Sequence, residues 1–185
     1  MRKARSTLIA AALLAACGSD DSQEPTSTAG ATTTDKQSPP TQAAALEAWL
    51  RDGAYKDWQC ESEVHASRAP SPHGFNRICS NDVISAHLAG DAAWPRGAAA
   101  VKELYASADA PTPLGYAVYL KTQSDSAAGA AWYWYERIGS DVVADGMGDS
   151  GTAKSICVGC HVAAGSDAAH TPTPGGRDQV YTPVP

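Results

Sequence analysis

The feature that most constrains this chain is a five-residue motif near its end, Cys157-Val158-Gly159-Cys160-His161. Two thiols at this spacing lie on one helical turn, where they can form thioether bonds to the two vinyl groups of a haem. The imidazole of the next residue can then bind the iron. The motif therefore predicts a haem c attached through Cys157 and Cys160, with His161 as the metal ligand.

The two cysteines of this motif have two other common interpretations, a zinc site and a redox-active pair. Zinc requires two further ligands at a comparable spacing. A redox-active C-x-x-C is expected after a strand of a βαβ unit. The chain contains neither pattern, so haem attachment is the favoured interpretation, and a haem-free domain in which the motif is structural is the remaining alternative.

The first 17 residues have the pattern of a lipoprotein signal peptide. Arg2, Lys3 and Arg5 precede an apolar run, and residues 14–17 read Leu-Ala-Ala-Cys, a lipobox in which the signal is cleaved before Cys17 and the thiol carries lipid. An ordinary secretory signal is the alternative. Both predict an exported protein, and the lipobox predicts lipid anchoring to a bacterial membrane, facing the periplasm or the cell exterior. No other segment approaches the roughly 20 apolar residues of a spanning helix, so the lipid would be the only membrane attachment.

Composition divides the rest of the chain in two. Residues 18–40 hold Ser, Thr, Asp, Gln, Pro and Ala without an aromatic residue, which predicts a disordered tether. Residues 41–185 are the predicted domain. The formal net charge is −6, and loss of three basic residues with the signal makes it about −9. Such an acidic balance argues against a nucleic-acid partner.

Of the five cysteines, Cys17 is the predicted lipid site and two belong to the C-x-x-C-H motif, which leaves Cys60 and Cys79. Residues 56–66 alternate as a half-buried strand, and 75–81 form a second strand beyond a Pro- and Gly-rich turn. A hairpin centred between Ala69 and Pro70 places the two cysteines directly opposite one another. This pairing predicts a disulfide, which can persist in an exported protein, with two free thiols as the alternative.

The remaining predicted elements are short. Helices are expected over 41–53, with Thr41 as its cap, and over 82–90, with Asp82 as its cap. Further strands are expected over 98–106, 114–121 and 131–138.

The C-terminal third is expected to contain little regular structure beyond the haem motif. Residues 139–152 are rich in Gly and Asp and predict a loop, which leads to a short helix carrying the motif. The tail 163–185 is expected to lie extended over the surface. The predicted fold class is therefore α+β, a mainly antiparallel sheet of about five strands with short helices, packed on one c-type haem.

Several segments precede the haem motif in a set order: Tyr55-Lys56-Asp57-Trp58, residues 64–74, Trp94-Pro95-Arg96-Gly97, Val101-Lys102-Glu103-Leu104 and the aromatic strand 132–135. With the C-x-x-C-H, this order resembles the cytochrome P460 family from about Trp49 to Val180. That family is similar in architecture to the β-type cytochromes c-prime. Its P460 members oxidise hydroxylamine, and the c-prime-β members bind nitric oxide and related gases.

The resemblance implies a haem with histidine on one side and an open position on the other, where a small nitrogen compound binds. It implies that Lys102, which matches the lysine of the family's G-x-x-x-V-K-E segment, is joined to a haem meso carbon. It also implies a homodimer and a redox partner that the sequence does not identify. Hydroxylamine-oxidising members carry a carboxylate about four residues before the first haem cysteine, where this chain has Ala153. Asp149 is the nearest acid, and ligand binding is favoured over hydroxylamine oxidation.

The alternative hypothesis is a low-spin electron-transfer cytochrome, in which His65 or Met147 supplies a second axial ligand. The methionine is disfavoured, because it precedes the motif by ten residues and no methionine follows His161. Arg96 and Arg137 are candidate partners for the haem propionates. Three other histidines are expected to be exposed or hydrogen bonded: His73, His87 and His170.

Overall fold

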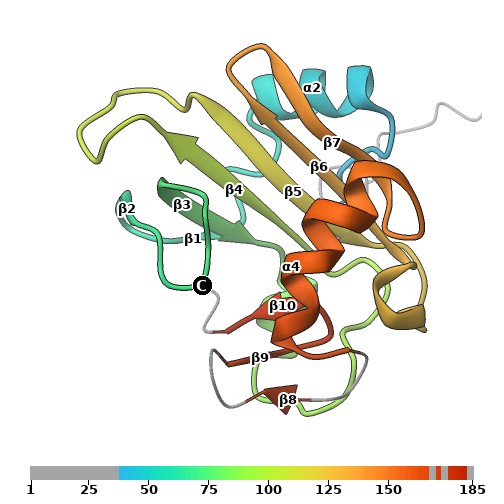
Figure 1. Cartoon of the computed structure of the whole chain (residues 1–185). Helices are drawn as coiled ribbons and strands as arrows, with labels where there is room; N and C mark the ends of the chain where they lie inside the picture. The colour runs from blue at the N-terminus through green and yellow to red at the C-terminus, as the bar shows by residue number, and fades with distance from the viewer. Residues whose placement is uncertain (1–37, 167–169, 172–174, 183–185) are drawn as a thin grey trace, which may run out of the picture. The chain divides into compact units, whose positions relative to one another are not determined.

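The computed structural model describes residues 38–166, 170–171 and 175–182, and its main element is an antiparallel sheet (Figure 1). Its seven strands follow the order β1-β3-β4-β5-β6-β7, and β2 also pairs with β3. The strands are β1 (Gln59–Cys60), β2 (His65–Ala66), β3 (Phe75–Ser80), β4 (Ala99–Tyr105), β5 (Gly115–Lys121), β6 (Trp132–Ile138) and β7 (Asp141–Met147). The predicted α+β class with a mainly antiparallel sheet is confirmed.

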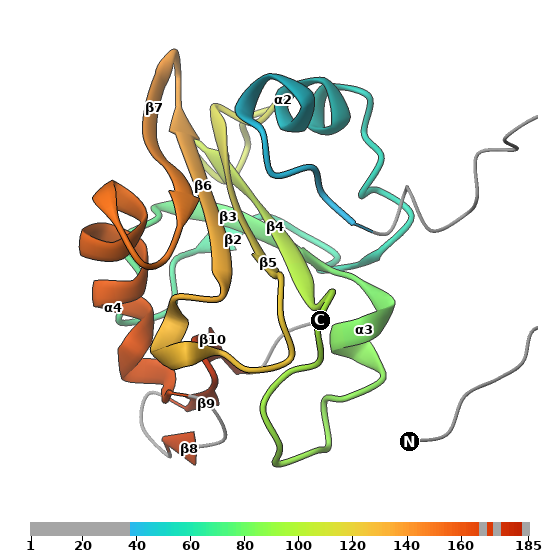
Figure 2. The same ribbon diagram turned by 90° about the vertical axis from the view of Figure 1, so that its right-hand side faces the viewer.

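Helices cover both faces of this sheet. Figure 2, at right angles to the first view, shows α2 and α4 on opposite sides of the strands. A second sheet, in the order β10-β9-β8, lies near the end of the chain. These elements are α2 (Ala43–Arg51), α3 (Asp82–Ser85), η1 (Ala127–Gly129), η2 (Ala153–Val158), α4 (Gly159–His161), η3 (Val162–Ala164), β8 (His170–Thr171), β9 (Gly176–Arg177) and β10 (Val180–Tyr181).

Alternation along the central strands produces two separate cores. On one face, Val101 and Val118 pack with Leu46 and Leu50 of α2. The opposite face holds a second cluster, which includes Trp132, Trp134, Ala153 and Cys157. All four aromatic residues of 132–135 are therefore buried, because successive side chains of β6 enter different cores.

The first hairpin is confirmed at its cysteines and differs beyond them. Cys60 pairs with Cys79 and is disulfide-bonded to it. The predicted continuous strand 56–66 is wrong, because it breaks between β1 and β2. At the break, Glu61 donates its backbone N–H to the Ile78 carbonyl, while the Ile78 N–H bonds to the Glu61 carboxylate. A side chain thus replaces a backbone acceptor, and His65 then pairs with Asn76, two residues out of the expected register.

Both predicted helix caps are wrong by one residue. Gln42, and not Thr41, precedes the first turn of α2, and it makes no side-chain capping bond. Asn81, and not Asp82, caps α3 by accepting the Ile84 N–H. The same carboxamide oxygen accepts the N–H of Ala99, so the cap also ties α3 to β4. The bond to Ala99, 18 positions further along the chain, favours Asn81 as the cap, because the same oxygen then holds both the helix and the strand.

The predicted loop 139–152 contains a full strand, β7, so that prediction is wrong. β7 pairs with β6 from Tyr133–Met147 to Ile138–Asp141, with a bulge between Glu136 and Arg137. Because β7 lies at the sheet edge, only one of its sides must fit a neighbouring strand. Its Gly and Asp residues are tolerated there although they disfavour central strands.

The described part of the tail enters the protein interior, which corrects the prediction that the tail lies over the surface. Arg177, Asp178, Gln179 and Val180 are all buried. Lys121 of β5, itself fully buried, forms an ion pair with Asp178 at 2.6 Å. A buried acid with a buried partner stabilises a segment that its composition suggested would remain in solvent.

The predicted signal peptide, with Cys17, and the tether up to residue 37 lie outside the described residues. Among the residues that the structure describes, no helix is both long and apolar enough to cross a membrane.

Candidate cofactor site

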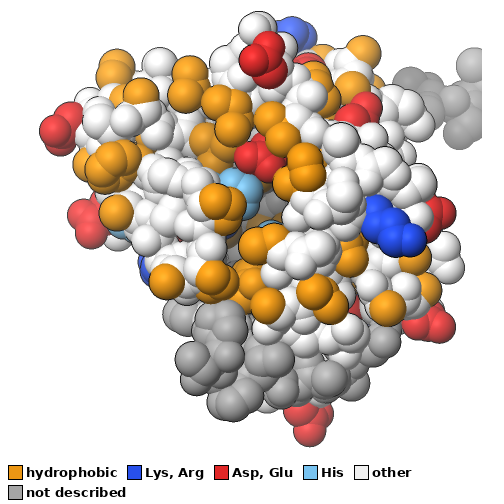
Figure 3. All heavy atoms as spheres, in the orientation of Figure 1, with side chains coloured by type: hydrophobic (Ala, Val, Ile, Leu, Met, Phe, Trp, Pro, Cys, Tyr) orange, Lys and Arg blue, Asp and Glu red, His pale blue; other side chains and the backbone are white. Residues whose placement is uncertain are grey.

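A cleft lies between the central strands and the helix that carries the C-x-x-C-H motif, on the sheet face opposite α2. Its empty volume is about 730 Å³, counting its open mouth. Figure 3 shows this face hollowed, with hydrophobic side chains gathered around histidine and acidic side chains. A mainly apolar and aromatic lining with a few polar side chains is typical of small-molecule and cofactor sites.

Strand register explains which side chains enter the cleft. Ala117 of β5 pairs with Lys102 of β4 on one side and with Glu136 of β6 on the other. All three side chains line the cleft. Because the central residue is only an alanine, the floor between the two charged side chains stays open. Two residues further along β5, on the same face of the sheet, Tyr119 pairs with Trp134, and these two side chains form an aromatic wall.

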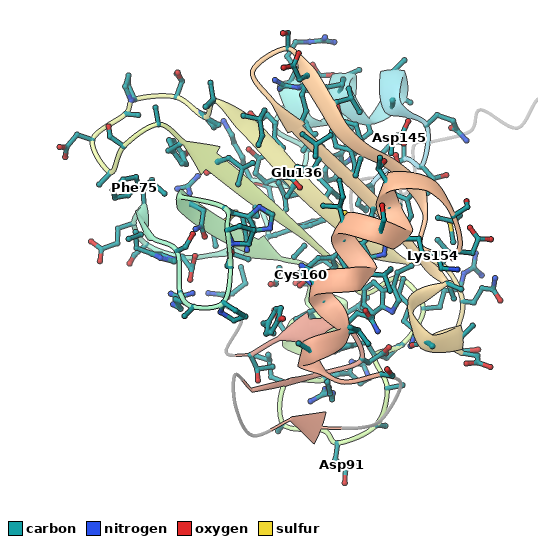
Figure 4. All side chains as sticks on the ribbon, in the orientation of Figure 1. Phe75, Asp91, Glu136, Asp145, Lys154 and Cys160 are labelled. Carbon is teal, nitrogen blue, oxygen red and sulfur yellow. A yellow bond between two sulfur atoms is a disulfide. The ribbon has the colours of Figure 1, made fainter. Side chains whose placement is uncertain are left out.

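The motif lies on a helix whose first part, η2, is π-helical and whose second part is α4. π-Helical turns are rare and are frequent at functional sites. This helix packs closely against the residue that follows β7, since a Cβ added at Gly148 would lie 2.7 Å from the Val158 side chain. Cys157 and Cys160 both line the cleft as free thiols (Cys160 is labelled in Figure 4). Burial raises the pKa of Cys157 to about 12, so this sulfur is a neutral thiol and not a reactive thiolate.

His161 lies among aromatic rings, with centroid distances of 4.6 Å to Trp134 and 5.3 Å to Tyr181. Its Nδ1 is 2.6 Å from the backbone carbonyl oxygen of Gln179. Because a carbonyl can only accept, Nδ1 is the protonated nitrogen. Burial lowers the pKa of His161 to about 3, so the ring is neutral and Nε2 keeps its lone pair. This is the tautomer that a metal-binding histidine requires.

Three ionisable side chains also line the cleft: Lys102, Glu136 and His73. Of these, only Lys102 was predicted from the sequence as a site residue. Glu136 is 7% exposed, and its carboxylate lies 3.4 Å from Nδ1 of His73 (Glu136 is labelled in Figure 4). Burial lowers the pKa of Lys102 to about 8. Within the described part of the chain this lysine makes no hydrogen bond or ion pair. Glu136 could have been predicted as a cleft residue, because it is the one acid that alternates with Trp132 and Trp134 along the strand.

Neither position considered for a carboxylate before the haem motif faces the cleft. Ala153 is buried in the second core. Asp149 is exposed and accepts a hydrogen bond from the Ser150 hydroxyl. A carboxylate is nevertheless present in the cleft, supplied by β6 from 21 residues before Cys157.

The two residues considered as second axial ligands lie away from this cleft. His65 bonds to Glu61 at 3.0 Å and lines a neighbouring cleft, which shares Ser71, Lys102 and Tyr181 with the first. Met147 packs against the core on the α2 side of the sheet. His73 is the histidine besides His161 that lines the cleft among the described residues.

The candidate propionate partners and the other histidines are also separate from the cleft lining. Arg96 is exposed. Arg137 bonds to Glu47 of α2 at 2.6 Å, on the opposite face of the sheet. The His87 ring bonds to the carbonyl of Val83. The side chain of His170 lies outside the described residues.

The residues of the cleft fit a covalently attached haem. Two thiols and one neutral imidazole lie on one helix beside apolar and aromatic walls. The indole N–H of Trp134 is buried in this wall without a hydrogen-bond partner among the described residues. In the same part of the chain, no three His, Cys, Asp or Glu side chains converge as a metal site.

No model of a known protein family matches the chain, and a search of the curated proteins found no match. The function proposed below therefore depends on the residues of the cleft and on the sequence resemblance.

Proposed function

We propose that the cleft holds one haem c, joined by thioether bonds to Cys157 and Cys160 and bound at its iron by Nε2 of His161. The observation that carries this proposal is the state of His161. The Gln179 carbonyl holds the proton on Nδ1, and burial keeps the ring neutral. Nε2 is thereby prepared for a metal, and the two thiols lie within one helical turn of it.

The haem would supply an iron centre that binds small ligands and exchanges electrons. The chain's own polar groups then select the ligand. A small, uncharged molecule suits a cleft whose walls are mainly aromatic and aliphatic. Glu136 can accept protons from a protic ligand such as hydroxylamine, whereas nitric oxide requires no proton acceptor. We therefore propose hydroxylamine and nitric oxide as the ligand class, in line with the resemblance to cytochrome P460.

Lys102 is the proposed residue for a link to a haem meso carbon. With a pKa near 8, the amine is neutral in about a tenth of molecules at pH 7, far more often than an ordinary lysine, and the neutral amine is the nucleophile. Such a link would replace one hydrogen on Nζ and one on the meso carbon, and it would require a two-electron oxidant such as peroxide. The cleft thus contains a base, Glu136 of β6, and a nucleophile, Lys102 of β4, on the two strands that flank β5.

The proposal requires an exported protein, because haem c attachment takes place outside the cytoplasm. The disulfide between Cys60 and Cys79 is typical of an oxidising compartment. We propose that the protein is exported and anchored through lipid at Cys17, with a soluble redox partner.

An optical spectrum of the haem-loaded protein tests the proposal. A five-coordinate spectrum that changes on addition of nitric oxide or hydroxylamine is expected, and a red-shifted reduced Soret band that Lys102→Met abolishes indicates the lysine link. A haem that binds neither ligand would contradict the proposal.

A second candidate function, electron transfer, is favoured by one observation, the presence of His73 in the cleft. A histidine there can occupy the open iron position and make the haem low-spin. Sharp α and β bands that His73→Ala converts to a five-coordinate spectrum would favour electron transfer over ligand chemistry.

A further inference from the structure

The segment that supplies the partner of His161 is a buried hairpin turn. β9 and β10 are joined by two residues, Asp178 and Gln179, and Arg177 pairs with Val180. Both turn residues have left-handed backbones, with φ of 47° and 68°. Such turns usually contain Asn or Gly and lie in solvent, whereas these two side chains are fully buried. An unfavourable backbone in a buried place requires strong interactions to hold it.

Asp178 supplies those interactions. Its carboxylate accepts hydrogen bonds from the Trp94 backbone N–H at 2.7 Å, from Lys121 Nζ at 2.6 Å and from Trp132 Nε1 at 3.3 Å. The Ser126 hydroxyl is a fourth donor. These donors come from β5, from β6 and from two loops, so one carboxylate fastens the turn to the sheet.

The turn presents the carbonyl of Gln179 to His161. The N–H of Gln179 bonds to the Gly165 carbonyl at 2.8 Å, and its own carbonyl accepts from Nδ1 of His161 at 2.6 Å. Neither polar atom of its side-chain amide has a partner among the described residues. The contribution of Gln179 to the site is therefore its backbone carbonyl, whose position depends on the residue before it.

We infer that Asp178 is a positioning residue, whose clamped carboxylate holds the Gln179 carbonyl at His161 and thereby keeps the ring proton on Nδ1. The consequence for the iron rests on the proposed function. A histidine whose Nδ1–H is hydrogen bonded donates more strongly through Nε2. Loss of the clamp then weakens donation to the iron, which raises the reduction potential of the haem.

The test uses a variant that weakens the clamp, by removing its ion pair and one of its two acceptor oxygens, without leaving an unpaired buried charge. Asp178→Asn alone would isolate the Lys121 ammonium in the interior. The double variant Asp178→Asn, Lys121→Met removes both charges and keeps the side-chain volumes. Ser126→Ala is a milder variant that removes one donor only. Gln179→Met is the matched control, since it removes the unpartnered amide and keeps the carbonyl.

The ring nitrogens of His161 are observed by NMR in the full chain, labelled with ¹⁵N-histidine, at neutral pH and without haem. The double variant is expected to lower the ratio of Nδ1–H to Nε2–H tautomer on the order of five- to tenfold, as loss of one neutral hydrogen bond would. Ser126→Ala is expected to cause a smaller change in the same direction, and Gln179→Met none. An unchanged ratio in the double variant, or in Ser126→Ala should the double variant not fold, would overturn the inference.

The haem-loaded chain gives the second readout, the reduction potential. The double variant is expected to have a higher potential than the unmodified chain, and Gln179→Met an unchanged one. An unchanged potential in the double variant overturns the role at the iron. Failure of the unmodified chain to bind haem contradicts the proposed function alone, because the tautomer ratio is measured without haem.

Discussion

Replacement of Lys102 by methionine is expected to stabilise the haem-free protein. The lysine is half-buried and makes no hydrogen bond or ion pair in the described part of the chain, and desolvation in the cleft lowers its pKa from 10.5 to about 8. At 1.36 kcal/mol per pKa unit, this decrease corresponds to about 3 kcal/mol at most. That free energy is the cost of keeping the ammonium charged inside the cleft at neutral pH. Methionine fills a similar volume without the charge.

The pH dependence distinguishes this cause from a general packing effect. Below pH 8 both the folded and the unfolded lysine are protonated, so the full cost is present. Between pH 8 and about 10.5 only the unfolded chain keeps the proton, so the unmodified protein gains stability as pH rises. The advantage of Lys102→Met should therefore be largest at pH 7 and should shrink toward pH 10.5.

Urea unfolding of the two proteins at pH 7 and at pH 10 measures this difference. For this assay the protein is produced in the periplasm of cells that lack haem-attachment machinery, so that the disulfide forms and the cleft stays free of haem. Lys154→Met, at an exposed lysine, is the control and is expected to change stability little. A Lys102→Met variant no more stable than the unmodified protein at pH 7, or an advantage independent of pH, would refute the reasoning.

Three further predictions concern the cleft and the two cores. In haem-loaded protein that oxidises hydroxylamine, Glu136→Gln is expected to lower kcat/KM about 100-fold or more with the haem absorbance unchanged; an unchanged rate in a dye-reduction assay excludes this carboxylate as the proton acceptor. Burial alone would raise the pKa of Glu103, but hydrogen bonds from Arg77 and two tyrosines outweigh it and lower the pKa. Glu103→Gln should therefore cost about 2 kcal/mol at pH 7, and this cost should decline as pH falls below the ordinary carboxyl pKa, as urea midpoints will show. Joint replacement of Cys60 and Cys79 by alanine, which opens a loop spanning 19 positions, should cost about 3 kcal/mol in the same assay.

The parts of the fold that could be predicted are those in which neighbouring residues carry the information. Alternation of apolar and polar side chains identified the three central strands within one or two residues at each end. The pairing of Cys60 with Cys79 followed from the symmetry of one hairpin. The C-x-x-C-H motif is contiguous, so its helix could be expected too.

The parts that were missed depend on partners distant in sequence. β7 is a strand because β6 offers it an edge, which its own Gly and Asp residues do not indicate. The turn at Asp178 is buried because Lys121, 57 positions earlier, is available to pair with it. Glu136 became visible as a cleft residue only once the register placed it beside Ala117 and Lys102. Register is a property of the whole sheet, and no single segment specifies it.

The most direct test of the haem proposal is the mass of the peptide that contains Cys157 and Cys160. The protein is co-produced with a haem c attachment system, denatured, treated with a thiol-alkylating reagent and digested. The proposal predicts that this peptide carries one haem through both sulfurs, that neither sulfur is alkylated, and that the haem resists extraction with acidified acetone. A peptide with two alkylated cysteines and no haem would contradict it.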